Sequence, residues 1–332
     1  MATLVTGCAG FIGSATAHAL LERGDDVVGI DNLNDYYDPQ LKQARLERLH
    51  NRFGNRFRFI RTDFADAAGL AAALDDVKFD CIVHLGAQAG VRYSIDHPVA
   101  YVQSNLVGHC NMLELARSRE TSHFVYASSS SVYGGNKSVP FRVEDRVDHP
   151  MSLYAATKKS DELLSESYSH LYRLPMTGLR FFTVYGPWGR PDMAMWIFTK
   201  ALLEGEPLPL YNGGQMRRDF TYIDDIVAGV LACLDPPPAD DGATKAGGST
   251  APHALYNIGN NRSEDLMRVV ELLEQATGKK ALIDPKPMQP GDVHETCADI
   301  SAIERDLGFQ PITTIDDGVP RFVDWYKSYQ AK

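Results

Sequence analysis

The stretch Thr6-Gly7-Cys8-Ala9-Gly10-Phe11-Ile12-Gly13 decides the fold of this chain. It follows a short apolar run at 2–6, typical of a buried strand, and precedes a helical pattern at 11–23 that Gly24 closes. Glycines three residues apart let the backbone turn tightly and approach a diphosphate, which the N-terminus of a helix attracts. We therefore predict a dinucleotide site at this turn, made by Gly7, Gly10, Phe11, Ile12 and Gly13.

Strand and helix patterns alternate through the first half of the chain. Further strands are expected at 26–31, 57–62, 79–85, 124–128 and 176–182, and helices at 67–74, 97–119 and 154–171. This alternation predicts an α/β fold with a doubly wound parallel sheet of the Rossmann type.

The second half of the 332 residues has a more mixed pattern. Helices are expected at 196–204, 223–234 and 263–277, the last with acidic residues in its first turn, and the Pro- and Gly-rich stretch 235–253 is expected to be an exposed loop. We predict a cofactor domain at 1–180 and a smaller mixed α/β C-terminal domain at 181–332 that binds substrate, with segments that return to the first domain.

Composition excludes several classes of protein. The net charge is −10 and no basic stripe is present, so nucleic acid is not expected as a partner. No apolar run is long enough to span a membrane, and the first strand begins too early for a signal peptide to precede it. The odd number of cysteines, five, without a CxxC motif, argues against a disulfide framework or a metal site and for a reducing compartment, so we expect a cytoplasmic protein.

Polar and small residues follow the strands that come after the glycine turn. Asp31 ends the second strand, 18 residues after Gly13, where a carboxylate can bind the adenosine ribose hydroxyls and would repel a 2′-phosphate, which favours NAD over NADP. Asp63 is a candidate for the adenine amino group or simply a turn residue, and Cys8 can contact the cofactor or serve in packing. The remaining candidate cofactor contacts are Asn32, Phe64, Leu85, Ala87, Gln88 and Asn105.

Tyr154 and Lys158 are the candidate proton-transfer residues. They lie four residues apart on a predicted helix, and therefore on one face of it. An ammonium group there lowers the tyrosine pKa from about 10, so that the phenol can exchange protons near neutral pH. Tyr133 and Lys137 have the same spacing, but two glycines separate them, and we interpret that pair as a loop coincidence.

Together with the serine-rich run Ser128-Ser129-Ser130-Ser131-Val132-Tyr133-Gly134, these motifs resemble the extended short-chain dehydrogenase/reductases. Within them the chain resembles the NAD-dependent nucleotide-sugar epimerases, most closely the UDP-glucuronate 4-epimerases, from residue 4 to about 326. The more specific stretches are 88–94, 185–193, 218–225 and 289–293, and one departure is Gly86, where the family pattern has alanine.

The resemblance implies a reaction at C4 of a UDP-sugar, with tightly bound NAD. Tyr154 would take the proton from O4, Lys158 would bind the nicotinamide ribose as well as tune the tyrosine, and Ser129 would hydrogen-bond O4. Related dehydratases and decarboxylases carry an acid next to the residue equivalent to Ser129. Here the neighbours are Ser130 and Ser131, which leaves epimerisation of UDP-glucuronate to UDP-galacturonate as the expected outcome.

The resemblance also supplies the expected substrate contacts. A sugar carboxylate would be held by hydroxyls and an arginine, the diphosphate by Arg218, and the uridine ribose by Asp292. The candidates at the carboxylate are Ser130, Ser131, Thr183, Arg190 and Arg92. Gln289 stands where some relatives have arginine.

Several alternatives remain open from sequence. They are a 4-epimerase of neutral sugars, such as UDP-glucose or UDP-N-acetylglucosamine, a dehydratase or decarboxylase, and a non-enzymatic NAD-binding module. The helices around 99–117 and 154–171 resemble those that form a dimer interface in the family, so a homodimer is expected.

Overall fold

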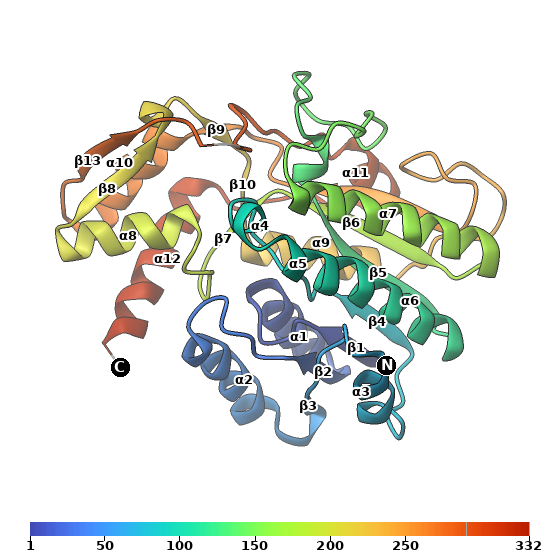
Figure 1. Cartoon of the computed structure of the whole chain (residues 1–332). Coiled ribbons are helices and arrows are strands. Elements are labelled where there is room, and N and C mark those ends of the chain that lie inside the picture. The colour runs from blue at the N-terminus through green and yellow to red at the C-terminus, as the bar shows by residue number, and fades with distance from the viewer. Residues whose placement is uncertain (290, 332) are drawn as a thin grey trace.

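A seven-stranded parallel sheet forms the centre of the computed structural model, which describes residues 1–289 and 291–331 (Figure 1). The strands lie in the order β11-β6-β5-β4-β1-β2-β3, and every neighbouring pair is parallel. Their bounds are β1 Ala2–Thr6, β2 Asp26–Asp31, β3 Phe57–Arg61, β4 Cys81–His84, β5 His123–Ser129, β6 Met176–Phe181 and β11 His253–Ile258. This is the predicted doubly wound fold, whose order reverses between β1 and β4.

Helices cover both faces of the sheet, which explains why the strands are almost continuously apolar. Every residue of β4 is buried, and along β5 Phe124 and Val125 point into the cores on opposite faces. One face is covered by α1 (Phe11–Arg23), α2 (Pro39–Phe53) and α9 (Ile223–Leu234). The other is covered by α3 (Ala67–Ala73), α6 (Gly108–Ser118) and α7 (Leu153–Tyr172).

Local capping fixes where the two helices beside the predicted site begin. The backbone enters α1 through Gly10 and leaves it through Gly24, which has the left-handed φ of 107° that glycine tolerates. The Ser152 hydroxyl accepts a hydrogen bond from the Ala155 N–H at 3.1 Å and so starts α7 next to Tyr154. The first turn of α7 is therefore held rigidly.

The C-terminal part is built from short two-stranded sheets and helices. The sheets pair β7 Thr183–Tyr185 with β10 Phe220–Tyr222, β8 Pro207–Tyr211 with β13 Leu282–Lys286, and β9 Arg217–Arg218 with β12 Glu264–Asp265. The helices are α8 Ala194–Glu204, α10 Leu266–Thr277, α11 Ser301–Leu307 and α12 Ile315–Gln330. α10 packs against both α8 and α12.

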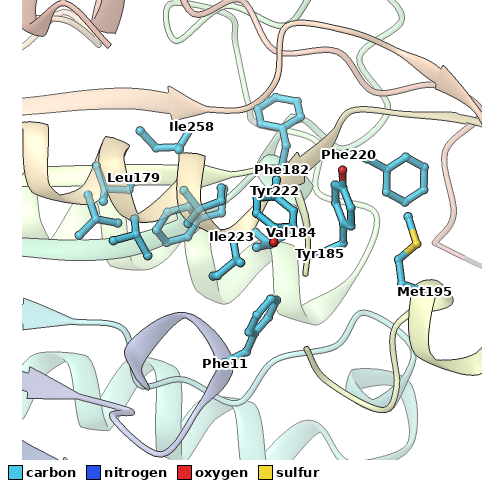
Figure 2. Packing of buried hydrophobic residues seen from close by; sticks show 14 of the residues in the cluster. Phe11, Leu179, Phe182, Val184, Tyr185, Met195, Phe220, Tyr222, Ile223 and Ile258 are labelled. Atoms are coloured by element: carbon cyan, nitrogen blue, oxygen red, sulfur yellow. The ribbon is translucent and has the colours of Figure 1, made fainter. Parts of the chain in front are cut away.

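One apolar core joins the sheet to the C-terminal part. Figure 2 shows Phe11 of α1 below Val184, Tyr185, Tyr222 and Ile223. Leu179 and Ile258 of the large sheet and Met195 and Phe220 of the C-terminal part belong to the same buried cluster. The two halves of the molecule are therefore packed together over a shared core.

Several details differ from the sequence predictions. The expected helix at 97–119 is instead α5 (Pro98–Tyr101), a π-helical segment (Val102–Val107) and α6. The acidic residues expected in the first turn of α10 form β12 instead. Helix α2 and strand β11 were not predicted, and β11 is the segment of the second half that returns to the large sheet.

The predicted exposed loop at 235–253 contains no helix or strand up to residue 252, but His253 already belongs to β11, and Ala246 and Ala251 within the loop are buried. Short helical turns complete the fold at α4 Tyr93–Asp96, Gly54–Arg56, Ser130–Tyr133 and Asn212–Gly214. In the part of the chain that the structure describes, no helix is both long enough and apolar enough to cross a bilayer.

Candidate active site

A cavity of about 860 Å³ lies where the carboxyl ends of the sheet strands meet the C-terminal part. Such a position, at the reversal of strand order, is where open α/β sheets bind ligands. The predicted residues that line it are Gly7, Gly10, Phe11, Ile12, Gly13, Asp31, Asn32, Phe64, Leu85, Ala87, Gln88, Arg92, Ser129, Ser130, Ser131, Tyr154, Lys158, Thr183, Arg190, Arg218 and Asp292. Asp63 and Asn105 are not part of its wall.

The glycine turn has the shape that a dinucleotide requires. Gly7 has a φ of 65°, and a Cβ on it would lie 2.7 Å from the Gly86 Cα. A Cβ on Gly13 would lie 2.1 Å from the Gly7 carbonyl oxygen. Because Gly10 caps α1 without any side chain, the first N–H groups of the helix border open space that suits a diphosphate. The residues present therefore fit NAD.

Of the residues around the glycine turn, some line the cavity and others pack behind it. Asp31 is 8% exposed and accepts hydrogen bonds from the N–H groups of Ala9 (3.2 Å) and Leu33 (2.9 Å). Burial raises the pKa of this carboxyl group, and these hydrogen bonds oppose the shift. Cys8 is fully buried against Gly29, so the structure favours its packing role.

Two predicted cofactor residues lie behind the cavity wall. Asp63 accepts hydrogen bonds from the Asn32 side chain at 3.0 Å and from the Ala65 N–H at 2.8 Å. These contacts fit its alternative interpretation as a turn residue. Asn105 is buried; its oxygen accepts from the Gln88 N–H at 2.8 Å, and its nitrogen donates to the Gln88 carbonyl and to Thr157 at 3.0 Å. It thereby ties the loop after β4 to α7.

The three candidate catalytic side chains meet in the cavity. Tyr154 is half-buried, whereas Lys158 and Ser129 are only 2% and 8% exposed. The Ser129 hydroxyl accepts from the Ser131 N–H and donates to the Ser131 hydroxyl, each at 3.2 Å. The Lys158 ammonium donates to Asp161 at 2.6 Å, a contact that sequence reasoning missed.

A buried ion pair holds the serine run against α7. Arg180 of β6 donates to both carboxylate oxygens of Glu162, at 2.8 and 2.9 Å, and Ser128 donates to the same carboxylate at 2.7 Å. Burial alone would raise the pKa of Glu162, but Arg180 outweighs it and the pKa falls to about 2. Tyr133 is buried, bonded to Asn257 and Arg180, and separated from Lys137 by Gly134 in a non-helical conformation, so the second Tyr–Lys pair is a coincidence of spacing.

The opposite wall of the cavity carries arginines that are paired with other groups of the protein. Arg190 binds both oxygens of Asp192, at 2.9 and 2.5 Å, and Tyr36 donates to the same carboxylate at 3.1 Å. Burial opposes the charge of Arg190, but Asp192 raises its pKa above the ordinary value. Thr183, the first residue of β7, also lines the cavity.

Arg218 and Arg92 approach the cavity from two further segments. Arg218 donates to the carbonyl oxygens of Arg217 (2.8 Å) and His294 (3.1 Å), and burial lowers its pKa while Asp292 opposes the shift. Arg92, half-exposed, lies 3.3 Å from Asp292 and over the ring of Tyr211. Pro290, between Gln289 and Gly291, lies outside the described residues.

Other lining residues were missed from sequence. They come from the loop and helix after β2 and from the apolar side of the C-terminal part, and they include Asn34, Tyr36, Tyr37, Lys42, Met193, Ile197, Phe198, Pro209, Tyr211, Met216 and Leu266. The amphipathic run at 39–53 was a signal for α2, and the tyrosine pair before it was a signal for a ligand-facing loop. The apolar residues carried no such signal, because a core residue and a pocket residue have the same pattern.

Comparison with known proteins agrees with this geometry. The sequence model of the GDP-mannose 4,6 dehydratase family matches residues 4–322. The chain is 46% identical to a probable UDP-glucuronate 4-epimerase of Rhizobium meliloti, over 98% of this chain and 97% of that protein, and 46% identical to UDP-glucuronate 4-epimerase 1 of Arabidopsis thaliana, over 99% and 77%.

A solved structure extends the likeness to three dimensions. It is UDP-glucuronic acid 4-epimerase from Bacillus cereus in complex with UDP-glucuronic acid and NAD, with a TM-score of 0.88 and 35% identity over 99% of this chain and 100% of that one. The resemblance drawn from the motifs is thereby confirmed. The chain belongs to the GDP-mannose 4,6 dehydratase family of NAD-binding Rossmann-fold proteins, and UDP-glucuronate 4-epimerases are among its full-length relatives.

Proposed function

We propose that this protein is an NAD-dependent isomerase that interconverts UDP-glucuronate and UDP-galacturonate by epimerisation at C4. The observation that carries the proposal is the single cavity in which Tyr154, Lys158 and Ser129 meet both the glycine turn and Arg218. A proton-transfer device, a dinucleotide site and a cation suited to a diphosphate therefore border one space of about 860 Å³.

The roles proposed for the residues follow from where they lie. Tyr154 removes the proton from O4 and later returns it, Ser129 hydrogen-bonds O4, and Lys158 holds a positive charge beside the phenol. Bound NAD supplies the oxidising capacity at C4 and is regenerated in each cycle. The glycine turn and Asp31 hold its diphosphate and adenosine ribose, while residues 1–180 supply most of this half and 181–332 most of the sugar-nucleotide half.

The cavity favours epimerisation over dehydration or decarboxylation. The carboxylates that line it are Asp31, Asp96, Asp192 and Asp292, and none belongs to the serine run beside Ser129. Asp192 is engaged by Arg190 and Asp292 by Arg92. Among the residues that the structure describes, no carboxylic acid therefore stands beside Ser129 to act as the general acid for later steps on a 4-keto sugar.

The residues that line the cavity also support a substrate sugar that carries a carboxylate. Ser130, Ser131 and Thr183 offer hydroxyl donors, and Arg190 offers positive charge in the same cavity. Several donors at the carboxylate would hold its bond to C5 out of alignment with the 4-ketone, and that restrains loss of carbon dioxide. Arg218 suits the diphosphate and Asp292 suits the uridine ribose.

We further propose a homodimer formed through α5, the π-helical segment and α7. Apolar side chains that are exposed in the monomer gather on these neighbouring helices: Val99, Val102 and Val107 on one side and Leu163 and Leu171 on the other. Exposed apolar surface of this extent supports an interface. Light scattering during gel filtration would measure a mass of twice 36.7 kDa. A cytoplasmic location stays a prediction.

The deciding experiment is the product profile of the purified protein with UDP-glucuronate and no added cofactor. Appearance of UDP-galacturonate would support the substrate, the reaction and retained NAD together. UDP-glucose is the comparison substrate, and turnover of that sugar alone would overturn the choice of the carboxylate. Release of carbon dioxide as the main product would overturn epimerisation.

A further inference from the structure

Lys158 has a buried carboxylate partner to which the proposed reaction assigns no role. Its Nζ lies 2.6 Å from Oδ2 of Asp161, one turn further along α7. The two side chains are 3% and 1% exposed, so water does not screen their interaction. The ammonium that faces the cavity is therefore half of an ion pair.

The other titratable groups packed around this pair leave Asp161 as the balancing charge. Glu162, its neighbour on α7, is occupied by Arg180 and Lys159. His84 of β4 and His109 of α6 are buried, and burial together with the nearby Lys158 lowers the pKa of His84 to about 3 and that of His109 well below its ordinary value. Both imidazoles are therefore neutral, and burial likewise keeps Tyr126 of β5 protonated.

The carboxylate of Asp161 gains little from any other group. Its Oδ1 has no hydrogen-bond partner among the residues that the structure describes, although it is buried. Burial raises the pKa of Asp161 to about 6, and Lys158 offsets part of that shift. A buried carboxylate with one oxygen unpaired is costly, and packing alone gives no reason to keep a charge at this place. This residue therefore has a purpose beyond packing.

We propose that Asp161 is the counter-ion of Lys158 and sets the pH range in which Tyr154 and Lys158 work. An ammonium alone strongly favours the phenolate of a nearby tyrosine. A carboxylate bonded to the same ammonium offsets part of its charge and weakens that attraction. This effect moves the working range toward higher pH. Asp161 is not among the described residues that line the cavity and is a positioning residue; the inference rests on the proposed function.

The test compares pH profiles of kcat/KM for the wild type, Asp161→Asn and Glu166→Gln. The first variant removes the counter-ion with no change of shape. The second removes the same charge from the same helix, at a half-exposed residue that binds His253 and Ser249. We expect the Asp161→Asn profile to move to lower pH by about one unit, the size of a nearby buried charge, and the Glu166→Gln profile to stay in place. An equal loss of rate at every pH, without movement, would overturn the proposal.

Two further arms separate this inference from the proposed substrate. All three proteins are assayed with UDP-glucuronate and with UDP-glucose, because the pair acts on the O4 proton of either sugar. Turnover of UDP-glucose alone would contradict the substrate and still yield the pH profiles. A crystal structure of the NAD-bound wild type is independent of activity. The ion pair is expected to persist there, and a Lys158 ammonium turned away from Asp161 would overturn the counter-ion role.

Discussion

The two walls of the cavity are built in different ways. Behind the cofactor side, charged groups are buried and bonded to fixed partners, as Glu162 is to Arg180, and they lie on the large sheet or on α7. On the substrate side, Arg92 and Arg218 come from short segments, and they bind a partly exposed carboxylate and backbone carbonyls, respectively. A buried pair holds its geometry permanently, whereas an exposed pair exchanges partners at little cost. The first wall suits a cofactor that stays, and the second suits a substrate that comes and goes.

Replacing Tyr154 with Phe is the most severe test of the cofactor wall. Loss of the phenol removes the O4 proton acceptor, so kcat should fall by about 10²–10⁴-fold. The ring still packs beside Tyr101, so the cofactor should remain bound. Rates are measured by separation of the two UDP-sugars, and NAD is measured after denaturation of the protein. Near-normal turnover would show that the proton leaves by another route.

Breaking the Arg180–Glu162 pair tests whether the catalytic face depends on buried charge. Glu162→Gln leaves the guanidinium buried and unmatched, which should destabilise the fold by about 3–5 kcal/mol. The measurement is the midpoint of urea unfolding. Glu114→Gln is the control, because its partner Arg117 is exposed on α6 and little change is expected.

The stability that Glu162→Gln removes should depend on pH, and the direction of that dependence follows from the pKa of Glu162. The pKa of Glu162 is lowered to about 2 in the folded protein, against about 4.3 in an unfolded chain. The carboxylate therefore contributes stability that is fully present above about pH 4.3 and disappears as the pH falls toward 2. The difference between wild type and Glu162→Gln should shrink over that window. A constant difference would show that the pair is not the cause.

The contrast between the two walls also explains which parts of the site could be predicted from the sequence. The glycine turn, Asp31 and the Tyr154–Lys158 spacing follow from local rules of strand, turn and helix, and in the structure these residues line one cavity. The ion-pair partners of Lys158 and Arg190 depend on side-chain conformations in the folded chain. Asp161 and Asp192 were therefore missed, although each lies within three residues of the cation that it pairs with. The apolar residues of α8 and β8 that line the cavity could not be distinguished from core residues, because both kinds follow the same spacing of apolar positions along the sequence.

Arg218→Met weakens the substrate wall at the arginine proposed to bind the diphosphate. The diphosphate would lose charged hydrogen bonds, each worth about 1.5–3 kcal/mol, so KM for UDP-glucuronate should rise at least tenfold with kcat nearly unchanged. Arg217→Met is the matched control. That neighbouring arginine is half-exposed and binds the Ser263 carbonyl, away from the cavity. An equal rise in KM for both variants would show that general surface charge, rather than a bound diphosphate, is responsible.

Arg92→Met should have the smallest effect, because it removes the most exposed of the cavity-lining arginines. Its pair with Asp292 spans 3.3 Å, and the Arg92 side chain is 49% exposed, so solvent and salt weaken it. We expect kcat/KM to fall about two- to threefold at low ionic strength, and the difference to fade in roughly 0.5 M salt, where the screening length is only a few ångströms. Methionine keeps the apolar contact with Tyr211 and isolates the charge. A loss of a hundredfold that salt does not change would mean that Arg92 binds the substrate directly in a water-free site, and the substrate wall would then resemble the cofactor wall more than its unliganded contacts indicate.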